Sequence, residues 1–245
     1  MWLGGLLFDE ILRFLDEQQP DILLLQEVYN GEDSSLDRQY RSIHTLQEKF
    51  HFRAQDFAPT YLEKLPFGKL ERGNAILSKF PIIDRNEWWL HDQYREYEDL
   101  PENYATSPRN LQHVVVRTPN AELNVYNLQG VWDLRGDNDS EARLHMSQVI
   151  VDAIQGKSNV ILGGDTNAQR HTKTIANIEQ HLTNVFGDEL VSSFNMRRKT
   201  NPGYATAVVD MLFVSPNIQV LEHECPDIDI SDHLPLVATF VVNET

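Results

Sequence analysis

The hydrophobic pattern of the chain alternates between helical spacing and short apolar runs. Apolar residues recur at helical spacing between Leu6 and Leu15, and Pro20 ends that predicted helix. Further helices are predicted at 36–50 and after Ser140, whose hydroxyl can cap a helix start. The other apolar runs predict strands at 21–25, 74–78, 82–90, 111–117, 122–128, 159–162, 207–214, 218–222 and 234–242.

This pattern favours a β-rich α/β fold in which two packed sheets, joined by antiparallel meanders, are flanked by helices. The chain has 245 residues and contains no linker, internal repeat or low-complexity run. We therefore expect one domain spanning residues 1–245.

Short polar clusters stand beside several of the predicted strands. They are Gln26-Glu27 after ILLL, Asp165-Thr166-Asn167 after VILGG, Asp210 after TAVV, and Ser231-Asp232-His233 before LPLVATFVV. Carboxylates, an amide and an imidazole can hold a cation, activate water and carry a proton, which is what cleavage of a phosphoester needs. Oxygen ligands of this kind suit Mg²⁺ or Mn²⁺. Zinc fits less well, because the chain has one cysteine and no helically spaced pair of histidines.

Charge and cysteine content limit the substrate and the compartment. The 37 acidic residues exceed the 21 basic ones, giving a formal net charge of −16, so long duplex DNA is an unfavourable substrate. The basic run Arg197-Arg198-Lys199 is either a solvated loop or a contact for substrate phosphate.

The single cysteine, Cys225, excludes an internal disulfide and favours a reducing, cytoplasmic location. The apolar opening is cut short by Asp9 and Glu10, which predicts neither a signal peptide nor a membrane span. We expect a monomer.

Five motifs in this order resemble the endonuclease/exonuclease/phosphatase superfamily, also called deoxyribonuclease I-like. They are PDILLLQEV, RGNAILSKFPI, GGDTNA, VDMLFVS and SDHLPL. The resemblance covers nearly the whole chain. It implies a four-layer α-β-β-α sandwich of two mixed, mostly antiparallel sheets with the active site at one end.

The resemblance also implies roles for particular residues. Glu27 and Asp232 would face a Mg²⁺ or Mn²⁺ ion. Asp165 would activate the attacking water, and Asn167 would orient that water or bind a phosphate oxygen. His233 would contact the scissile phosphate, with Asp210 fixing its tautomer.

Three further positions are candidates for substrate binding. Asn74 either supports the cleft at the substrate or only hydrogen-bonds neighbouring backbone, and Arg109 is either directed at the site or exposed on a loop. Gln129 stands where many relatives have a histidine; it can donate a hydrogen bond to phosphate but cannot carry a proton near neutral pH.

Two departures leave alternatives open. One is Gln129; the other is the family's first strand, which ends in asparagine and normally precedes a segment like MWLGG. We expect that extending the reading frame upstream of Met1 restores that strand.

The favoured function is hydrolysis of a phosphate ester, whose substrate is a nucleic-acid end, a nucleotide, a sugar phosphate or a lipid headgroup. The alternatives are a catalytically weakened metal- or phosphate-binding module and a different metal-dependent hydrolase. The aromatic and acidic segment 88–104 is either a lid over the site or an exposed hairpin end.

Overall fold

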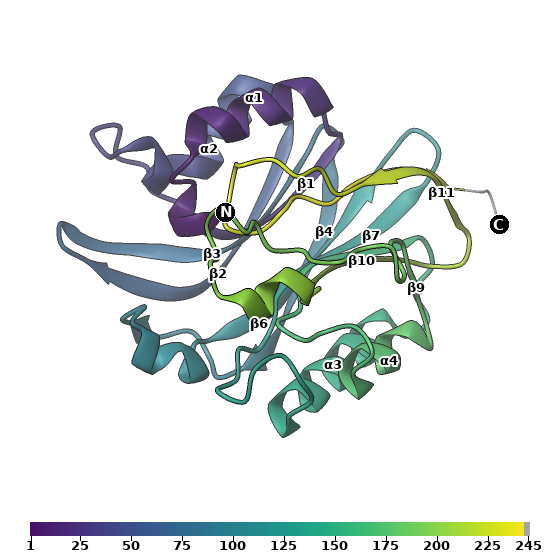
Figure 1. Ribbon diagram of the computed structural model, residues 1–245. Coiled ribbons are helices and arrows are strands. Elements are labelled where there is room, and N and C mark those ends of the chain that lie inside the picture. The colour runs from purple at the N-terminus through teal and green to yellow at the C-terminus, as the bar shows by residue number, and fades with distance from the viewer. Residues whose placement is uncertain (243–245) are drawn as a thin grey trace.

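The computed structural model describes residues 1–242 and arranges them as helix, sheet, sheet and helix (Figure 1). The first sheet comprises, in spatial order, β1 (Ile22–Tyr29), β3 (Gly68–Ser78), β2 (Ala54–Leu65) and β5 (Glu96–Tyr97). The second comprises β4 (Ile82–His91), β6 (Arg109–Arg117), β7 (Glu122–Gln129), β8 (Val160–Asp165), β10 (Asp210–Val214) and β9 (Thr183–Asn184). A hairpin contains β11 (Ile218–Glu224) and β12 (Val237–Val242). The predicted α/β sandwich is confirmed, with parallel pairing limited to β2 with β5 and β7 with β8.

The helices form the two outer layers. Helices α1 (Phe8–Gln18) and α2 (Ser42–Phe50) cover the first sheet, and α3 (Glu141–Ile154) and α4 (Lys173–Glu179) cover the second (Figure 1). The short 3₁₀ helices are η1 (Trp2–Gly4), η2 (Arg38–Arg41), η3 (Pro101–Thr106) and η4 (Pro202–Thr206). The predicted cap of α3 is confirmed, because the Ser140 hydroxyl accepts the Arg143 N–H at 3.3 Å.

Three apolar layers alternate with the four layers of secondary structure. One lies between α1, α2 and the first sheet, and another lies between α3, α4 and the second sheet. The third fills the space between the sheets, where Ile76 of β3 joins Val125 of β7 and Ile161 of β8. The strands β3, β7 and β8 are therefore buried on both faces, which explains the consecutive apolar residues at 75–77, 125–126 and 160–162.

Strand β2 and helix α4 escaped prediction from the sequence, as did the two-residue strands β5 and β9. Strand β2 pairs along its whole length with β3, although its sequence contains Pro59 and several charged residues. Pro59 lies where the register of the two strands shifts, a position at which a missing N–H costs no ladder hydrogen bond. Helix α4 has seven residues, too few to show a helical period.

Within residues 1–242, β1 pairs only with β3 and β12 pairs only with β11, so each has one unpaired edge. The family's asparagine-bearing first strand stays a prediction.

None of the helices in this described part of the chain has the length and apolar character needed to cross a bilayer.

The buried imidazole of His113 makes stability sensitive to acid. Its Nε2 lies 3.1 Å from the Asn124 Oδ1, its ring stacks on Tyr126 with centroids 4.2 Å apart, and burial lowers its pKa. The folded state therefore binds a proton at His113 less readily than the unfolded state does. Protonation of the unfolded state thus lowers the free energy of unfolding as pH falls below about 6.5, whereas above that pH His113 is neutral in both states and causes no such loss.

Consequently, a His113→Gln variant should lose unfolding free energy less steeply than the parent between about pH 6.5 and pH 5, by up to about 1.4 kcal/mol per pH unit. Urea unfolding at several pH values measures this slope. The matched control is His181→Gln, at an exposed position. Parallel slopes for the parent and His113→Gln would contradict the prediction.

Candidate active site

The polar clusters that follow separate strands meet in one shallow pocket at an end of the sandwich. The pocket is lined by Met1, Trp2, Gln26, Glu27, Gln129, Asp165, Asp210, Ser231, Asp232 and His233. Six of the nine residues predicted from the sequence are in this set. The segments that contribute them are far apart in the chain, so the pocket exists only in the folded protein.

Strand register places three of these residues side by side. Gln129 at the end of β7 is paired with Asp165 at the end of β8, and Asp165 is paired with Asp210 at the start of β10. Close approach of the strands requires glycine at Gly164, where φ is +141° and a Cβ would lie 2.0 Å from the Leu128 carbonyl oxygen. The two central carboxylates are therefore held beside each other by the sheet itself.

Asp165 is buried and fixed by the turn that follows it. The Asn167 backbone N–H donates to its Oδ1 at 2.7 Å, and the Asn167 side-chain amide donates to its Oδ2 at 3.0 Å. The same amide donates to the Gly130 carbonyl at 3.1 Å. Burial, together with the neighbouring Asp210 carboxylate, raises the pKa of Asp165 to about 7. A carboxylate with such a pKa can exchange a proton near neutral pH.

His233 and Asp210 form a hydrogen-bonded pair with 2.7 Å between the His233 Nδ1 and the Asp210 Oδ2. Burial opposes the charged imidazolium, but the Asp210 carboxylate outweighs it and raises the pKa of His233 to about 10. Near neutral pH His233 is therefore an imidazolium whose Nδ1 proton is directed at Asp210 and whose Nε2 proton can be donated to a substrate. Sequence reasoning predicted this pairing, and the geometry agrees with it.

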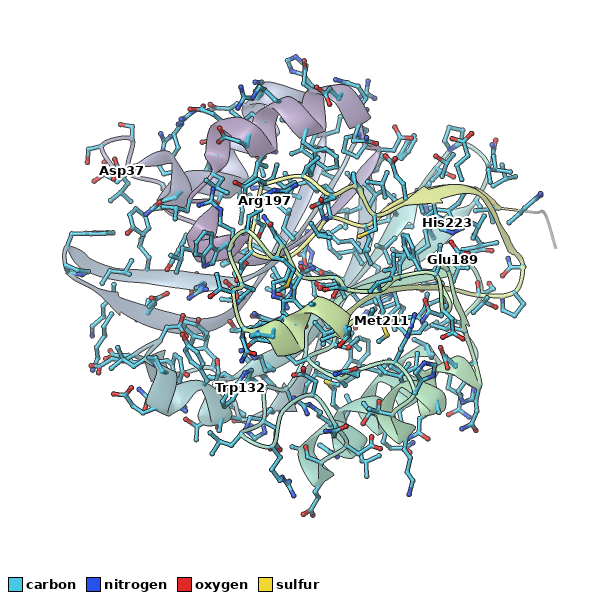
Figure 2. All side chains as sticks on the ribbon, in the orientation of Figure 1. Asp37, Trp132, Glu189, Arg197, Met211 and His223 are labelled. Atoms are coloured by element: carbon cyan, nitrogen blue, oxygen red, sulfur yellow. The ribbon has the colours of Figure 1, made fainter. Side chains whose placement is uncertain are left out.

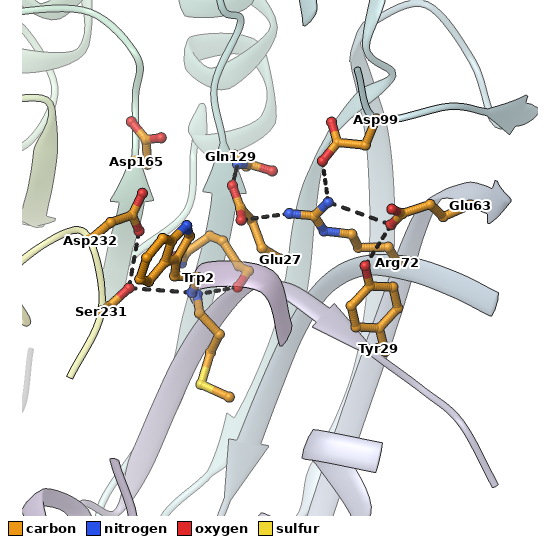
Figure 3. A network of polar contacts seen from close by, with 12 residues as sticks. Trp2, Glu27, Tyr29, Glu63, Arg72, Asp99, Gln129, Asp165, Ser231 and Asp232 are labelled. Atoms are coloured by element: carbon orange, nitrogen blue, oxygen red, sulfur yellow. Dashed lines mark hydrogen bonds and ion pairs between the residues drawn. The ribbon is translucent and has the colours of Figure 1, made fainter. Parts of the chain in front are cut away.

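Glu27 reaches the pocket because β1 bulges at that point. The pairing of β1 with β3 shifts register between Leu25 and Val28, and Glu27 adopts the left-handed φ of +60°. Burial opposes ionisation, yet the Arg72 guanidinium, 2.6 Å from the Glu27 Oε2, outweighs it and lowers the pKa of Glu27 to about 2. Glu27 is therefore an anion near neutral pH, and Figure 3 shows its carboxylate in contact with the Arg72 guanidinium.

Asp232 and the basic run lie together. Lys199 pairs with Asp232 at 2.9 Å, while Arg197 pairs with Asp227 at 2.6 Å and Arg198 with Asp229 at 2.6 Å. Arg197 is labelled in Figure 2 beside the C-terminal segment. Of this basic run, Lys199 forms an ion pair with a pocket residue, and Arg198 lies 5.9 Å from the ring centroid of Trp2, which also lines the pocket.

The three remaining candidates lie at different depths. Gln129 lines the pocket, and Arg109, which is buried behind it, donates to the Gln129 Oε1 at 2.5 Å. Asn74 is fully buried and donates to the Asn110 Oδ1 at 2.9 Å, outside the pocket lining. Asn74 is thus hydrogen-bonded to the neighbouring strand β6, mainly through a side chain, and its contact with substrate stays a prediction.

The donor set fits a hard divalent cation. Glu27 and Asp232 both line the pocket and could supply oxygen ligands, and Mg²⁺ commonly takes only one or two protein carboxylates and keeps several waters. Among residues 1–242, no three His, Cys, Asp or Glu side chains form a compact metal cage. This arrangement suits an oxygen-ligated, partly hydrated ion better than zinc.

Sequence reasoning missed Arg72, although the RGNAILS motif contains it. Arg72 is buried, with 4% of its side chain exposed, and it contacts Glu27, Glu63 and Asp99 (Figure 3). The signal was the period of two along β3, which places Arg72 on the same face as Asn74. Its partners Glu63 and Asp99 could not be predicted, because they come from β2 and from the segment after β5.

Comparison with known proteins agrees with this fold. The family model described as "Endonuclease/Exonuclease/phosphatase family" matches residues 5–233. A search of curated proteins found no match. Solved structures that resemble the chain include an endonuclease/exonuclease/phosphatase from Beutenbergia cavernae DSM 12333, with a TM-score of 0.70, 17% identity, and coverage of 95% of this chain and 65% of that one.

Two further structures have a similar backbone. The mannosyl-6-phosphatase Bt3783 of Bacteroides thetaiotaomicron has a TM-score of 0.65 and 17% identity, with coverage of 94% of this chain and 89% of that one. The human Nocturnin catalytic domain with bound sulfate anion has a TM-score of 0.68 and 16% identity, with coverage of 96% and 85%. At such identities these structures establish the shared fold. Together with the family match along most of its length, they show that the chain belongs to the endonuclease/exonuclease/phosphatase family.

Proposed function

We propose that the protein hydrolyses a phosphate ester, a phosphodiester or a phosphomonoester, by attack of water with Mg²⁺ or Mn²⁺ bound. The observation that carries the proposal is the hydrogen-bonded His233–Asp210 pair lying beside Asp165 and facing Glu27 in one pocket. This set contains a proton carrier, a base with a pKa near neutrality and an anionic cation ligand. A phosphoester hydrolase needs all three.

Each side chain has its own part in the reaction. Asp165 accepts a proton from the attacking water, and Asn167 keeps the Asp165 carboxylate oriented through two hydrogen bonds. His233 meets the phosphate through Nε2, while Asp210 holds its tautomer through Nδ1. Glu27 and Asp232 would hold the divalent ion, which when bound neutralises charge on the phosphate.

Substrate contacts come from the polar groups around this centre. Gln129 has one side-chain N–H left after its bond to Glu27, and Lys199 lies beside Asp232, so both can meet phosphate oxygens. The net charge of −16 favours a compact substrate, which could be a nucleic-acid end, a nucleotide, a sugar phosphate or a lipid headgroup.

A hydrolysis panel tests the proposal. Purified protein is assayed with Mg²⁺, Mn²⁺ or EDTA on bis-p-nitrophenyl phosphate, p-nitrophenyl phosphate, single-stranded and duplex DNA, RNA and sphingomyelin. We expect turnover that depends on the metal and disappears in the Asp165→Ala/His233→Ala double variant. Metal binding without turnover on any substrate would replace the proposal with a metal- or phosphate-binding module.

A further inference from the structure

Both oxygens of the Glu27 carboxylate are held by neighbouring side chains. Arg72 Nη2 donates to Oε2 at 2.6 Å, and the Gln129 side-chain nitrogen donates to Oε1 at 2.6 Å. Gln129 is itself fixed by Arg109. Since an ionised carboxylate has about four acceptor positions, two remain for a ligand in the pocket. The plane of the carboxylate is therefore set by its neighbours.

Arg72 is in turn held on its far side. Its Nη1 pairs with Asp99 and lies 3.5 Å from the Glu63 Oε2, which also accepts the Tyr29 hydroxyl at 2.7 Å (Figure 3). The guanidinium packs against the Tyr29 ring at 5.7 Å from its centroid. Arg72 thus has carboxylates on both sides of its planar fork, and a rigid fork is well suited to holding a carboxylate in one orientation.

We propose that Arg72 is a positioning residue that presents the Glu27 carboxylate to the divalent ion, and that Asp99 holds Arg72 in place. The inference rests on the proposed function, because it requires Glu27 to bind the ion. It also gives the segment 92–99 a role in the site, since this segment carries the Asp99 carboxylate that pairs with Arg72. Outer partners of metal ligands commonly contribute about 10- to 100-fold to metal affinity.

The charge of Arg72 makes the inference easy to distinguish from a simple electrostatic effect. A cation 2.6 Å from a metal ligand repels a second cation, so electrostatics alone predicts that removing Arg72 tightens metal binding. Positioning predicts the opposite sign. Mn²⁺ affinity of an Arg72→Met variant, measured by isothermal titration calorimetry, separates the two. We expect binding weaker by about 10- to 100-fold.

Two further variants test the positioning role even if the Arg72→Met protein misfolds. Arg72→Lys keeps the charge but loses the fork, and we expect about 10-fold weaker Mn²⁺ binding with circular dichroism unchanged. Asp99→Asn removes the outer partner, and we expect a similar loss. Its matched control is Glu98→Gln, one residue away, which removes the same charge but contacts Lys64 and not Arg72. Glu98→Gln should stay within about twofold of the parent.

The outcomes separate the inference from the proposed function. Unchanged or tighter Mn²⁺ binding in folded Arg72→Lys overturns the positioning role, as does equal loss in Asp99→Asn and Glu98→Gln. In both cases the parent still binds Mn²⁺ and still needs Glu27, as a Glu27→Gln variant would show, so the proposed function stands. Absence of Mn²⁺ binding in the parent overturns both.

Discussion

An Asp165→Asn variant is expected to lose about 10²- to 10⁴-fold in kcat while its fold is retained. Asparagine has nearly the shape of aspartate and can still bond the Asn167 backbone N–H, but it cannot accept a proton from water. Steady-state kinetics on bis-p-nitrophenyl phosphate with Mn²⁺ measure the loss. Because the missing group acts in the chemical step, KM should change far less than kcat.

The matched control for this change is Asp152→Asn, an identical substitution at an exposed position of α3. It should keep the turnover of the parent. An Asp165→Asn protein that retains most of its turnover would remove Asp165 from the role of base and would leave water activation to another group.

An Asp210→Asn variant is expected to lose up to about 10⁴-fold in kcat for a different reason. Asp210 accepts the proton on the His233 Nδ1 at 2.7 Å, whereas an asparagine amide can present a donor there and favour the opposite tautomer. Without the Asp210 carboxylate, which outweighs burial and raises the pKa of His233 to about 10, the imidazole would lose the positive charge that it brings to its contact with phosphate. Kinetics report the loss, and ¹⁵N chemical shifts of His233 report the tautomer.

The chain offers a second Asp–His pair as a control. Asp188 lies 3.4 Å from the His171 Nε2 with both side chains exposed, so Asp188→Asn makes the same chemical change away from the pocket. Turnover should be unaffected by it. If Asp210→Asn retained both turnover and the Nδ1 tautomer, the pair would have no part in catalysis.

The sequence predicted much of the site because its residues terminate apolar strands. Asp165 ends one apolar strand and Asp210 begins another, and both strands could be recognised from the sequence. Strand ends at one edge of a sheet lie close together, as the pairing of Asp165 with Asp210 shows. Glu27 could be placed in the pocket by resemblance to the family. Its bulge and left-handed backbone could not be predicted, because they depend on how β1 pairs with β3.

The parts that could not be predicted depend on contacts between distant segments. Strand β2 is held by β3 and carries its own polar residues into the interior, so its pattern does not alternate simply. Arg72 and Asp99 are separated by the strands β4 and β5, and their ion pair brings together segments whose spacing in the sequence gives no indication of contact. Residues that hold the reactive groups in place are harder to recognise in a sequence than the reactive groups themselves, because a charged residue can occur in any strand.

Gln129, Asp165 and Asp210 are paired across β7, β8 and β10, so the site forms only when these strands pair in the native register. A slip of one residue in β8 would turn the Asp165 side chain to the other face of its sheet and abolish the site as a unit. Opening of the central strands also approaches global unfolding in cost, because they are buried on both sides. Loss of activity during denaturation should therefore follow the cooperative transition itself, and turnover can serve as a direct reporter of native strand register.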